Sequence, residues 1–261
     1  MKGRGTLPIK RRQESNTGFY HVIVKGINNE RIYNQKRERI YFKKIILKYL
    51  KKYQVEIFAF CIMSNHAHVI IRAELQELSM FMAVILAEYA NYYNYKHKRN
   101  GHVFQNRFIS ECIENESYFW NCIRYVHMNP VKARMVKNPL RYAYSSMKEY
   151  YTRTPLVLHE NALVLYEKHF AGYEAFEEFH QLRHYEVFKD IPEEISSQQI
   201  EVAALILDEL SEMSDLKLKI QMFEEKHLRK KYMQQLQSIL KLSDARTKKL
   251  YDVMKEITEN G

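Results

Sequence analysis

The sequence predicts an α+β fold: a four-stranded antiparallel sheet with helices packed on it, followed by an all-helical C-terminal region. Two observations lead to this class. Up to about residue 130, short β-branched and aromatic segments alternate with longer segments of helical spacing, in the order β-α-β-β-α-β-α. From residue 160 onward the spacing is almost wholly helical, and the segments are rich in Glu, Lys and Leu. Hydrophobic residues make up 46% of the 261, so a sizeable core can be buried.

Four segments have the composition of strands and end at turn residues. They are residues 19–27, 55–63, 66–72 and 102–113. Only the turn residues Ser64-Asn65 separate the second segment from the third, so these two segments are expected to form an antiparallel hairpin.

Three segments have apolar residues at helical spacing. They are residues 35–53, 76–98 and 115–128. Asn115 or Ser117 is expected to cap the third helix, because both residue types accept hydrogen bonds from backbone N–H groups at helix starts. The same helix is expected to stop at Asn129-Pro130, since proline has no N–H to continue it.

Composition and residue pattern divide the chain into three parts: a basic, flexible arm over residues 1–17, the α+β domain over residues 18–150, and a helical region over residues 151–261. In the last part, Ser243-Asp244 could cap a second helix and create a helix-turn-helix-like end. Two interpretations stay open there: a second DNA-contacting module, or a helical bundle for packing or self-association.

Charge separates the two halves of the chain. The net charge is +10, but residues 1–150 carry 26 − 11 = +15 and residues 151–261 carry 15 − 20 = −5. The basic half therefore favours a polyanionic partner, of which nucleic acid is the commonest, although a solvated basic surface would give the same count. The negative charge of the second half favours the bundle interpretation. Many of the 20 tyrosines lie among the Lys and Arg residues, where they could stack on bases or simply fill the core.

Three cysteines without a CxxC pair suit a reducing cytoplasm. The N-terminal residues lack the apolar segment of a signal peptide, and no apolar run reaches the roughly 18–20 residues of a membrane span. The sequence therefore predicts a cytoplasmic protein with no membrane partner. Nucleotide-binding P-loop, GxSxG and HExxH motifs are absent.

Two histidines, His66 and His68, stand two apart on a predicted strand. Side chains at this spacing point to the same face, so the two imidazoles could hold one divalent metal ion, while Ala67 points into the opposite layer. An HxH pair also occurs by chance, and alone it is a weak signal.

Tyr125 and Asn129 stand four apart on a predicted helix, which places both on one face. A tyrosine hydroxyl can attack a phosphodiester, and an amide oxygen can be a third metal ligand. The alternative is a packed tyrosine and an asparagine that ends the helix.

The order and spacing of SNHAHVII, FQNRF at 104–108 and YVHMNPVKA at 125–133 resemble the REP-associated tyrosine transposases. These are relatives of the single-tyrosine transposases of small bacterial insertion sequences, within the HUH (His-hydrophobic-His) endonucleases. The resemblance covers roughly residues 18–150 and implies a ferredoxin-like or RRM-like nuclease fold. Many relatives have Pro at the position of Ser64, a larger aliphatic at Ala67 and Trp at Phe104.

The resemblance implies a role for each matched residue. His66, His68 and Asn129 would hold Mg²⁺ or Mn²⁺, and Tyr125 would attack single-stranded DNA to form a 5′-phosphotyrosine, which a 3′-OH later resolves. The implied partner is single-stranded or hairpin DNA, and the implied location is the bacterial nucleoid. A homodimer is left open, because relatives differ in this respect.

Further contacts are suggested less directly. The residues that could touch DNA are Lys10, Arg11, Arg12, Gln105, Arg107 and Lys132. For each of them a surface, structural or non-contacting role fits the sequence equally well. His21 is expected in the core or hydrogen-bonded, and His127 should face away from Tyr125.

Three functions fit these features: a transposase-like nuclease and strand-transferase, a host-adopted protein that binds hairpins without catalysis, and an initiator-like or relaxase-like HUH nuclease. The last is disfavoured because relaxases carry longer metal-binding signatures and other domains.

Overall fold

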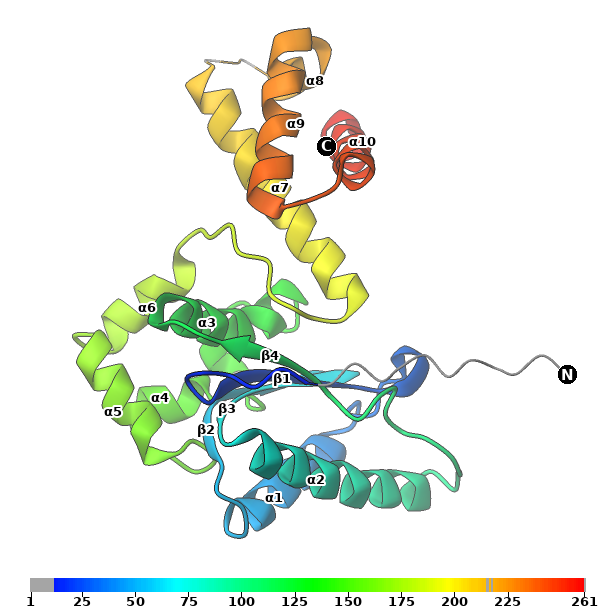
Figure 1. Ribbon diagram of the computed structural model, residues 1–261, viewed down its shortest axis with the longest axis vertical. Helices are drawn as coiled ribbons and strands as arrows, with labels where there is room; N and C mark the ends of the chain where they lie inside the picture. The colour runs from blue at the N-terminus through cyan, green and yellow to red at the C-terminus, as the bar shows by residue number, and fades with distance from the viewer. Residues whose placement is uncertain (1–11, 215, 217, 261) are drawn as a thin grey trace, which may run out of the picture. The chain divides into compact units, whose positions relative to one another are not determined.

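The computed structural model describes residues 12–214, 216 and 218–260, and these form two compact units (Figure 1). The first unit ends at His180 and the second begins at Gln181. This division lies further along the chain than the change in composition near residue 150, because several helices that follow residue 150 pack within the first unit.

The first unit is built on a four-stranded antiparallel sheet, in agreement with the fold class that the sequence predicts. Its strand order is β2-β3-β1-β4. The strands are β1 (Phe19–Lys25), β2 (Glu56–Ile62), β3 (His66–Arg72) and β4 (Ile109–Ile113). β1 and β3 are central and almost wholly buried, and most of their residues are apolar.

Helices cover both faces of this sheet. Figure 1 shows α1 (Lys36–Leu50) and α2 (Leu75–Lys96) on one face and α3 (Glu116–Lys132) on the other. Two single turns, Ile27–Asn29 and Pro139–Arg141, and the short helix α4 (Met147–Thr152) connect these elements. The helices α5 (Glu160–His169) and α6 (Tyr173–Gln181) follow, and α5 contacts the edge strand β2. The element order β-α-β-β-α-β-α is therefore confirmed.

Two expected boundaries were wrong. Only Ile109–Ile113 of residues 102–113 is a strand, because the preceding polar residues form a loop that touches the sheet by one bridge, Gly26 to Phe104. Helix α3 continues through Pro130 to Lys132 instead of stopping before the proline. Pro130 lacks the N–H that would bond the carbonyl of Val126, so the helix forgoes one hydrogen bond there and still continues to Lys132. At the other end Asn115 is the cap, and its side chain accepts from Tyr118 N at 2.8 Å.

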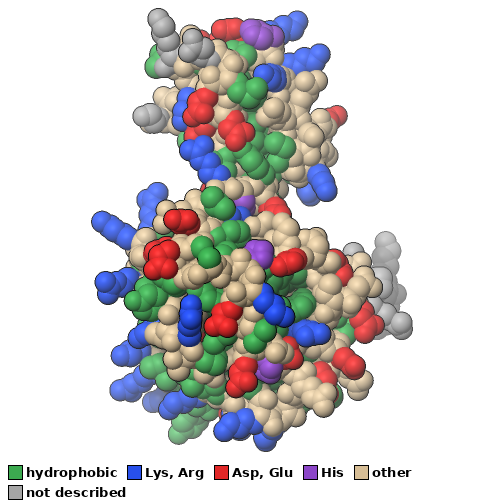
Figure 2. Space-filling view, turned by 90° about the vertical axis from the view of Figure 1, so that its left-hand side faces the viewer, with side chains coloured by type: hydrophobic (Ala, Val, Ile, Leu, Met, Phe, Trp, Pro, Cys, Tyr) green, Lys and Arg blue, Asp and Glu red, His purple; other side chains and the backbone are tan. Residues whose placement is uncertain are grey.

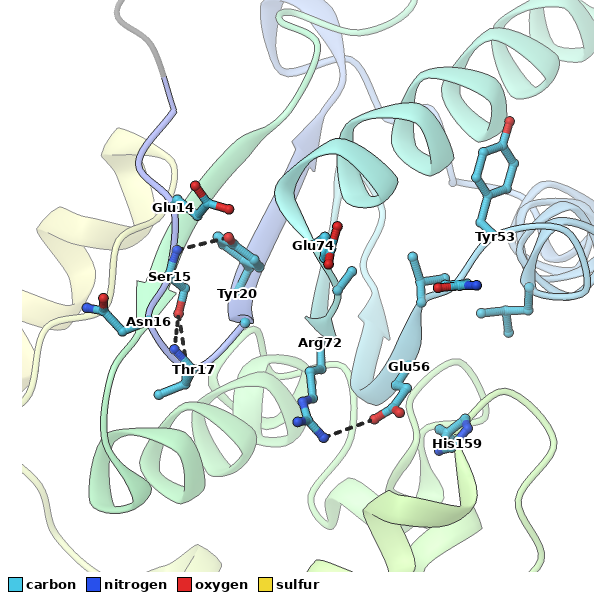
Figure 3. Close-up of a pocket in the computed structure, with 15 residues that line it drawn as sticks. Glu14, Ser15, Asn16, Thr17, Tyr20, Tyr53, Glu56, Arg72, Glu74 and His159 are labelled. Atoms are coloured by element: carbon cyan, nitrogen blue, oxygen red, sulfur yellow. Dashed lines mark hydrogen bonds and ion pairs between the residues drawn. The ribbon is translucent and has the colours of Figure 1, made fainter.

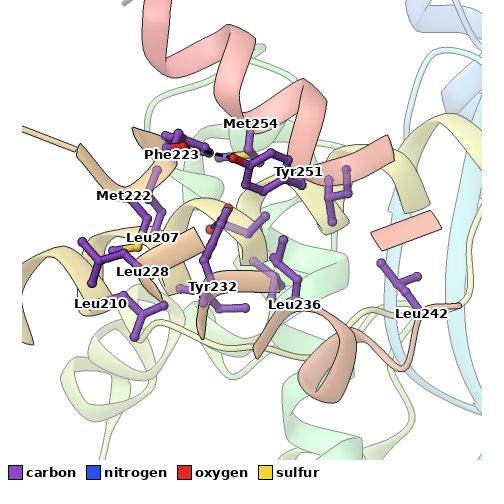
Figure 4. Packing of buried hydrophobic residues seen from close by; sticks show 14 residues of the cluster. Leu207, Leu210, Met222, Phe223, Leu228, Tyr232, Leu236, Leu242, Tyr251 and Met254 are labelled. Carbon is purple, nitrogen blue, oxygen red and sulfur yellow. Dashed lines mark hydrogen bonds between the residues drawn. The ribbon is translucent and has the colours of Figure 1, made fainter. Parts of the chain in front are cut away.

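The second unit is helical, as expected for this region. It contains α7 (Pro192–Met213), α8 (Gln221–Glu224), α9 (Lys226–Leu240) and α10 (Asp244–Asn260). Figure 4 shows its core, in which Leu207, Tyr232 and Tyr251 bring side chains from three helices together. The apolar pattern of this region is thus accounted for by a bundle with its own core. Within the described residues, no helix combines the length and apolar character that spanning a bilayer requires.

Candidate active site

The two histidines of the HxH pair lie side by side on β3. Alternation along the strand puts His66 and His68 on the sheet face that α3 covers, and their ring centroids are 4.8 Å apart. Ala67 is fully buried, and its neighbours across the ladder are Val24 and Ile62. The strand thus presents both imidazoles to one layer, while the residue between them belongs to the other.

Hydrogen bonds fix the orientation of each imidazole. His66 Nδ1 lies 2.8 Å from Asn65 Oδ1, and His68 Nδ1 lies 3.0 Å from His21 Nε2. Because an amide oxygen only accepts, His66 carries a proton on Nδ1, which leaves Nε2 as the nitrogen that could bind a metal ion. Burial, and secondarily the neighbouring His21, lowers the pKa of His68 well below its ordinary value, so this imidazole is neutral near pH 7.

Helix α3 places the tyrosine beside this pair. The ring centroid of Tyr125 is 5.7 Å from that of His68 and 6.1 Å from that of His21, in both cases edge to face. One turn later on the same helix, Asn129 is buried, and its Nδ2 donates to the carbonyl of Tyr125 at 3.0 Å. Since the amide nitrogen is engaged with the helix, the amide oxygen is the group that Asn129 can offer to a metal ion.

These residues fit the divalent metal that the sequence resemblance implies. His66 and His68 each have Nδ1 oriented by a neighbour, the usual arrangement of ligand histidines. Two nitrogens and one amide oxygen leave coordination positions for phosphate oxygens. A ligand set of this kind suits Mg²⁺ or Mn²⁺ acting on a phosphodiester.

The predicted DNA contacts lie in more than one place. Lys132 is near the tyrosine, with Nζ 5.5 Å from the centre of the Tyr125 ring. Gln105, Arg107 and Arg12 line a groove of about 610 Å³ between α2 and the loop 101–108. Lys10 and Arg11 lie outside the described residues.

His127 belongs to a separate network, so it faces away from Tyr125 as expected. Its Nδ1 is 3.0 Å from His180 Nε2, and its Nε2 is 2.7 Å from Ser146 Oγ. His180 Nδ1 donates to the carbonyl of Phe176 at 2.6 Å. Nothing in the sequence singled out His180 or Ser146, because neither belongs to a motif.

A second cavity, of about 620 Å³, lies at the opposite end of the sheet, where β1 begins and β3 ends (Figure 3). Three of its lining residues are Glu14, Glu56 and Glu74, and the cation Arg72 is 3.8 Å from Glu56 Oε2. This acidic lining disfavours a phosphate backbone, and Arg12, Gln105, Arg107 and Lys132 do not line the cavity.

Residues 15–129 match the family model described as "Transposase IS200 like". This segment is similar to the IS200-like transposases. The resemblance to transposases of small insertion sequences is therefore confirmed, and with it a transposase-like, DNA-binding function. All three proposed metal ligands and Tyr125 fall within the matched transposase segment, whereas Lys132 and Arg12 fall outside it.

No curated protein matches this chain. One solved structure to which it is similar is described as "Structure of the REP associates tyrosine transposase bound to a REP hairpin". The two chains are 18% identical, and the match covers 59% of this chain and 91% of the other, with a TM-score of 0.46. The family assignment rests on the sequence match alone.

Proposed function

We propose that this protein cleaves and rejoins single-stranded DNA, with Tyr125 as the nucleophile and a divalent ion held by His66, His68 and Asn129. The observation that carries the proposal is the position of the Tyr125 ring on α3, whose centroid lies 5.7 Å from that of the His68 ring on β3. His68 and Tyr125 are far apart in the sequence but close together in the fold, and both lie within the residues 15–129 that match the transposase family model.

The chemistry of the chain's own residues follows from this arrangement. The Tyr125 hydroxyl gives up its proton and its oxygen attacks the scissile phosphorus, forming a phosphotyrosine on the 5′ side while the 3′ oxygen leaves and becomes a free hydroxyl. A bound divalent ion would draw charge from the phosphate oxygens. The ammonium group of Lys132, near the Tyr125 ring, favours the negative charge that gathers there. The phosphotyrosine bond conserves the energy of the original linkage, so a 3′-OH can resolve it without ATP.

A groove beside α2 fits the DNA strand. The guanidinium of Arg12 stacks 3.6 Å from the centre of the Phe108 ring, and Nη2 donates to the Phe108 carbonyl at 3.4 Å. Burial, and after it the positive charge of Arg107, lowers the pKa of Arg12. Two mutually repelling cations held in one groove are stabilised by an anion, and a phosphate of the DNA supplies one.

Basic residues also gather elsewhere on the first unit. On the face shown in Figure 2, Lys and Arg side chains lie along one edge, with Asp and Glu side chains nearer the middle.

We expect the DNA to be hairpin-bearing, because a folded strand offers a shape landmark next to an accessible phosphate. The nucleoid is the matching location for such a substrate.

The test uses hairpin-bearing single-stranded oligonucleotides, incubated with the full chain and Mn²⁺ or EDTA and resolved on a denaturing gel. A covalent protein–DNA band that needs Mn²⁺ and is absent in Tyr125→Phe is the expected result. Tyr95→Phe is the matched control: Tyr95 is 88% exposed and is the tyrosine most open to adventitious reaction, yet its loss should leave the band unchanged.

A band that persists in Tyr125→Phe would contradict the assigned nucleophile. Hairpin binding without any band, in the wild-type chain and with Mn²⁺ present, would instead favour a host-adopted binding protein without catalysis.

A further inference from the structure

The imidazole of His68 is one member of a row of polar side chains that crosses three strands. His68 Nδ1 on β3 lies 3.0 Å from His21 Nε2 on β1, and the two rings stack with 21° between their planes. On the far side, His21 Nδ1 lies 3.9 Å from Glu111 Oε2 on β4, the residue opposite it in the ladder. The row therefore runs β3, β1, β4 across the sheet face under α3.

The proton positions along this row follow from a single requirement. If His68 binds a metal through Nε2, its Nδ1 must carry the proton of the neutral ring. His21 Nε2 must then accept that proton's hydrogen bond, so neutral His21 carries its own proton on Nδ1. This N–H faces the carboxylate of Glu111. Each residue thus selects the tautomer of the one before it.

We propose that His21 and Glu111 are positioning residues that hold His68 in the tautomer and orientation needed to bind the divalent ion. The inference rests on the proposed metal-dependent function and adds two residues to it. Ligand histidines are commonly oriented through their second nitrogen by a carboxylate, directly or through an intermediate group.

A packing role does not account for these side chains. The positions of the same face that flank the pair, Ile23 and Ile70, are apolar, and an apolar residue at position 21 would fill that layer without burying a polar ring. Burying an imidazole costs free energy unless a hydrogen bond offsets it, so His21 is explained by what it bonds to rather than by the space it fills.

The experiment measures Mn²⁺ affinity of the full chain from the loss of the free-ion electron paramagnetic resonance signal. His21→Phe keeps an aromatic ring but removes the acceptor, and we expect about 10–100-fold weaker binding. His21→Gln can return an acceptor oxygen, and we expect it to restore most of that loss. The matched control is His180→Phe, because His127 and His180 form a buried pair of the same geometry elsewhere in the unit; its Mn²⁺ affinity should equal that of the wild type.

Different failures have different meanings. Mn²⁺ binding that His66→Ala abolishes but His21→Phe leaves unchanged would overturn the positioning row alone. Absence of Mn²⁺ binding in the wild-type chain would overturn the metal centre of the proposed function, and the row with it.

A second measurement does not depend on how well the variants fold. Two-bond ¹H–¹⁵N spectra of the metal-free wild-type chain, labelled at histidine, report which nitrogen of each ring carries the proton. The expected signature is a proton on Nδ1 of His68 and on Nδ1 of His21. A proton on Nε2 of His68 would overturn the proposal.

Discussion

Two histidine pairs in the first unit have the same internal geometry and different surroundings. In the pair His21–His68 and in the pair His127–His180, the nitrogens are 3.0 Å apart and the ring centroids 5.2 Å apart. The ring planes differ by 21° in the first pair and 20° in the second. Burial lowers the pKa of both His68 and His127 well below the ordinary value.

The ends of the two pairs differ. All four ring nitrogens of His127 and His180 are taken up by each other, by the hydroxyl of Ser146 and by the carbonyl of Phe176, which closes the network. The pair on the sheet instead leads from the carboxylate of Glu111 toward His66 and Tyr125. A buried imidazole pair is therefore not in itself evidence of function. The groups that contact its outer nitrogens indicate whether the pair stabilises the fold or could orient a ligand.

The largest effect comes from removing one member of each pair. His68→Ala should lower Mn²⁺ affinity and DNA cleavage by more than the roughly 100-fold that loss of an outer-shell partner can cost. His127→Ala should keep Mn²⁺ affinity but lower the free energy of unfolding by about 2–4 kcal/mol, because it leaves buried partners unsatisfied and a cavity. Urea unfolding followed by the fluorescence of Trp120, the single tryptophan, reports on this unit. Equal effects of the two variants on Mn²⁺ affinity would erase the distinction.

Acidification should lower the free energy of unfolding through the protonation of His180. Burial above all lowers the pKa of His180 to about 4, with Arg124 adding to the effect and the carbonyl of Phe176 opposing it. Because the folded pKa lies below the unfolded value of about 6.5, the unfolded chain binds more protons between these values. The contribution is complete above pH 6.5 and is lost as the pH falls toward 4, at a cost of up to about 3 kcal/mol.

Unfolding free energies of the wild type and His180→Phe, compared from pH 7.5 to 4.5, test this expectation. The wild type should lose stability more steeply on acidification than the variant. Parallel pH profiles would show that protonation of His180 does not contribute.

Ser146, which contacts His127, and Glu111, which lies near His21, allow a finer comparison of the two pairs. Ser146→Ala removes the hydroxyl that closes the network on His127 and should cost about 1–3 kcal/mol in unfolding free energy, with unchanged Mn²⁺ affinity. Glu111→Gln keeps the size of the side chain and removes its charge, so it should weaken Mn²⁺ binding about tenfold with little change in stability. Isothermal titration with Mn²⁺ and thermal unfolding of both variants distinguish these outcomes; a reversed pattern would contradict the roles assigned to the two ends.

The smallest effect is expected away from both pairs, in the groove beside α2. Arg107→Gln should leave Mn²⁺ affinity and stability unchanged and weaken DNA binding several-fold, while the slope of log affinity against log salt falls by about one. Fluorescence anisotropy with a labelled hairpin oligonucleotide at several salt concentrations measures both quantities. An unchanged slope would remove Arg107 from the DNA interface.

Much of the fold could be predicted from local patterns. The strand His66–Arg72 and the hairpin it forms were predicted from an apolar run bounded by Ser64-Asn65, and the structure confirms both. The loop before β4 was mistaken for strand because its residues mix aromatic and polar types, and their tertiary role is to line a groove. Pro130 misled the prediction of the helix end, because a helix can continue past a proline if it forgoes one backbone hydrogen bond.

The site was predictable where it depends on spacing within one element. His66 with His68, and Tyr125 with Asn129, are local pairs on one strand and one helix. Glu111 was not identified, because its position beside His21 depends on strand order and register, which bring together residues from separate strands. For the same reason no pattern indicated that Ser146 or His180 would meet His127.

Helix α3 follows all four strands of the sheet in the chain, and this order has a consequence for synthesis. A nascent chain exposes the HxH strand, and then β4 with Glu111, before Tyr125 has left the ribosome. Every component of the proposed metal pocket on the sheet is thus translated before the nucleophile. A polypeptide interrupted before Glu116 lacks Tyr125, so premature termination at that point yields a product without the nucleophile that we propose.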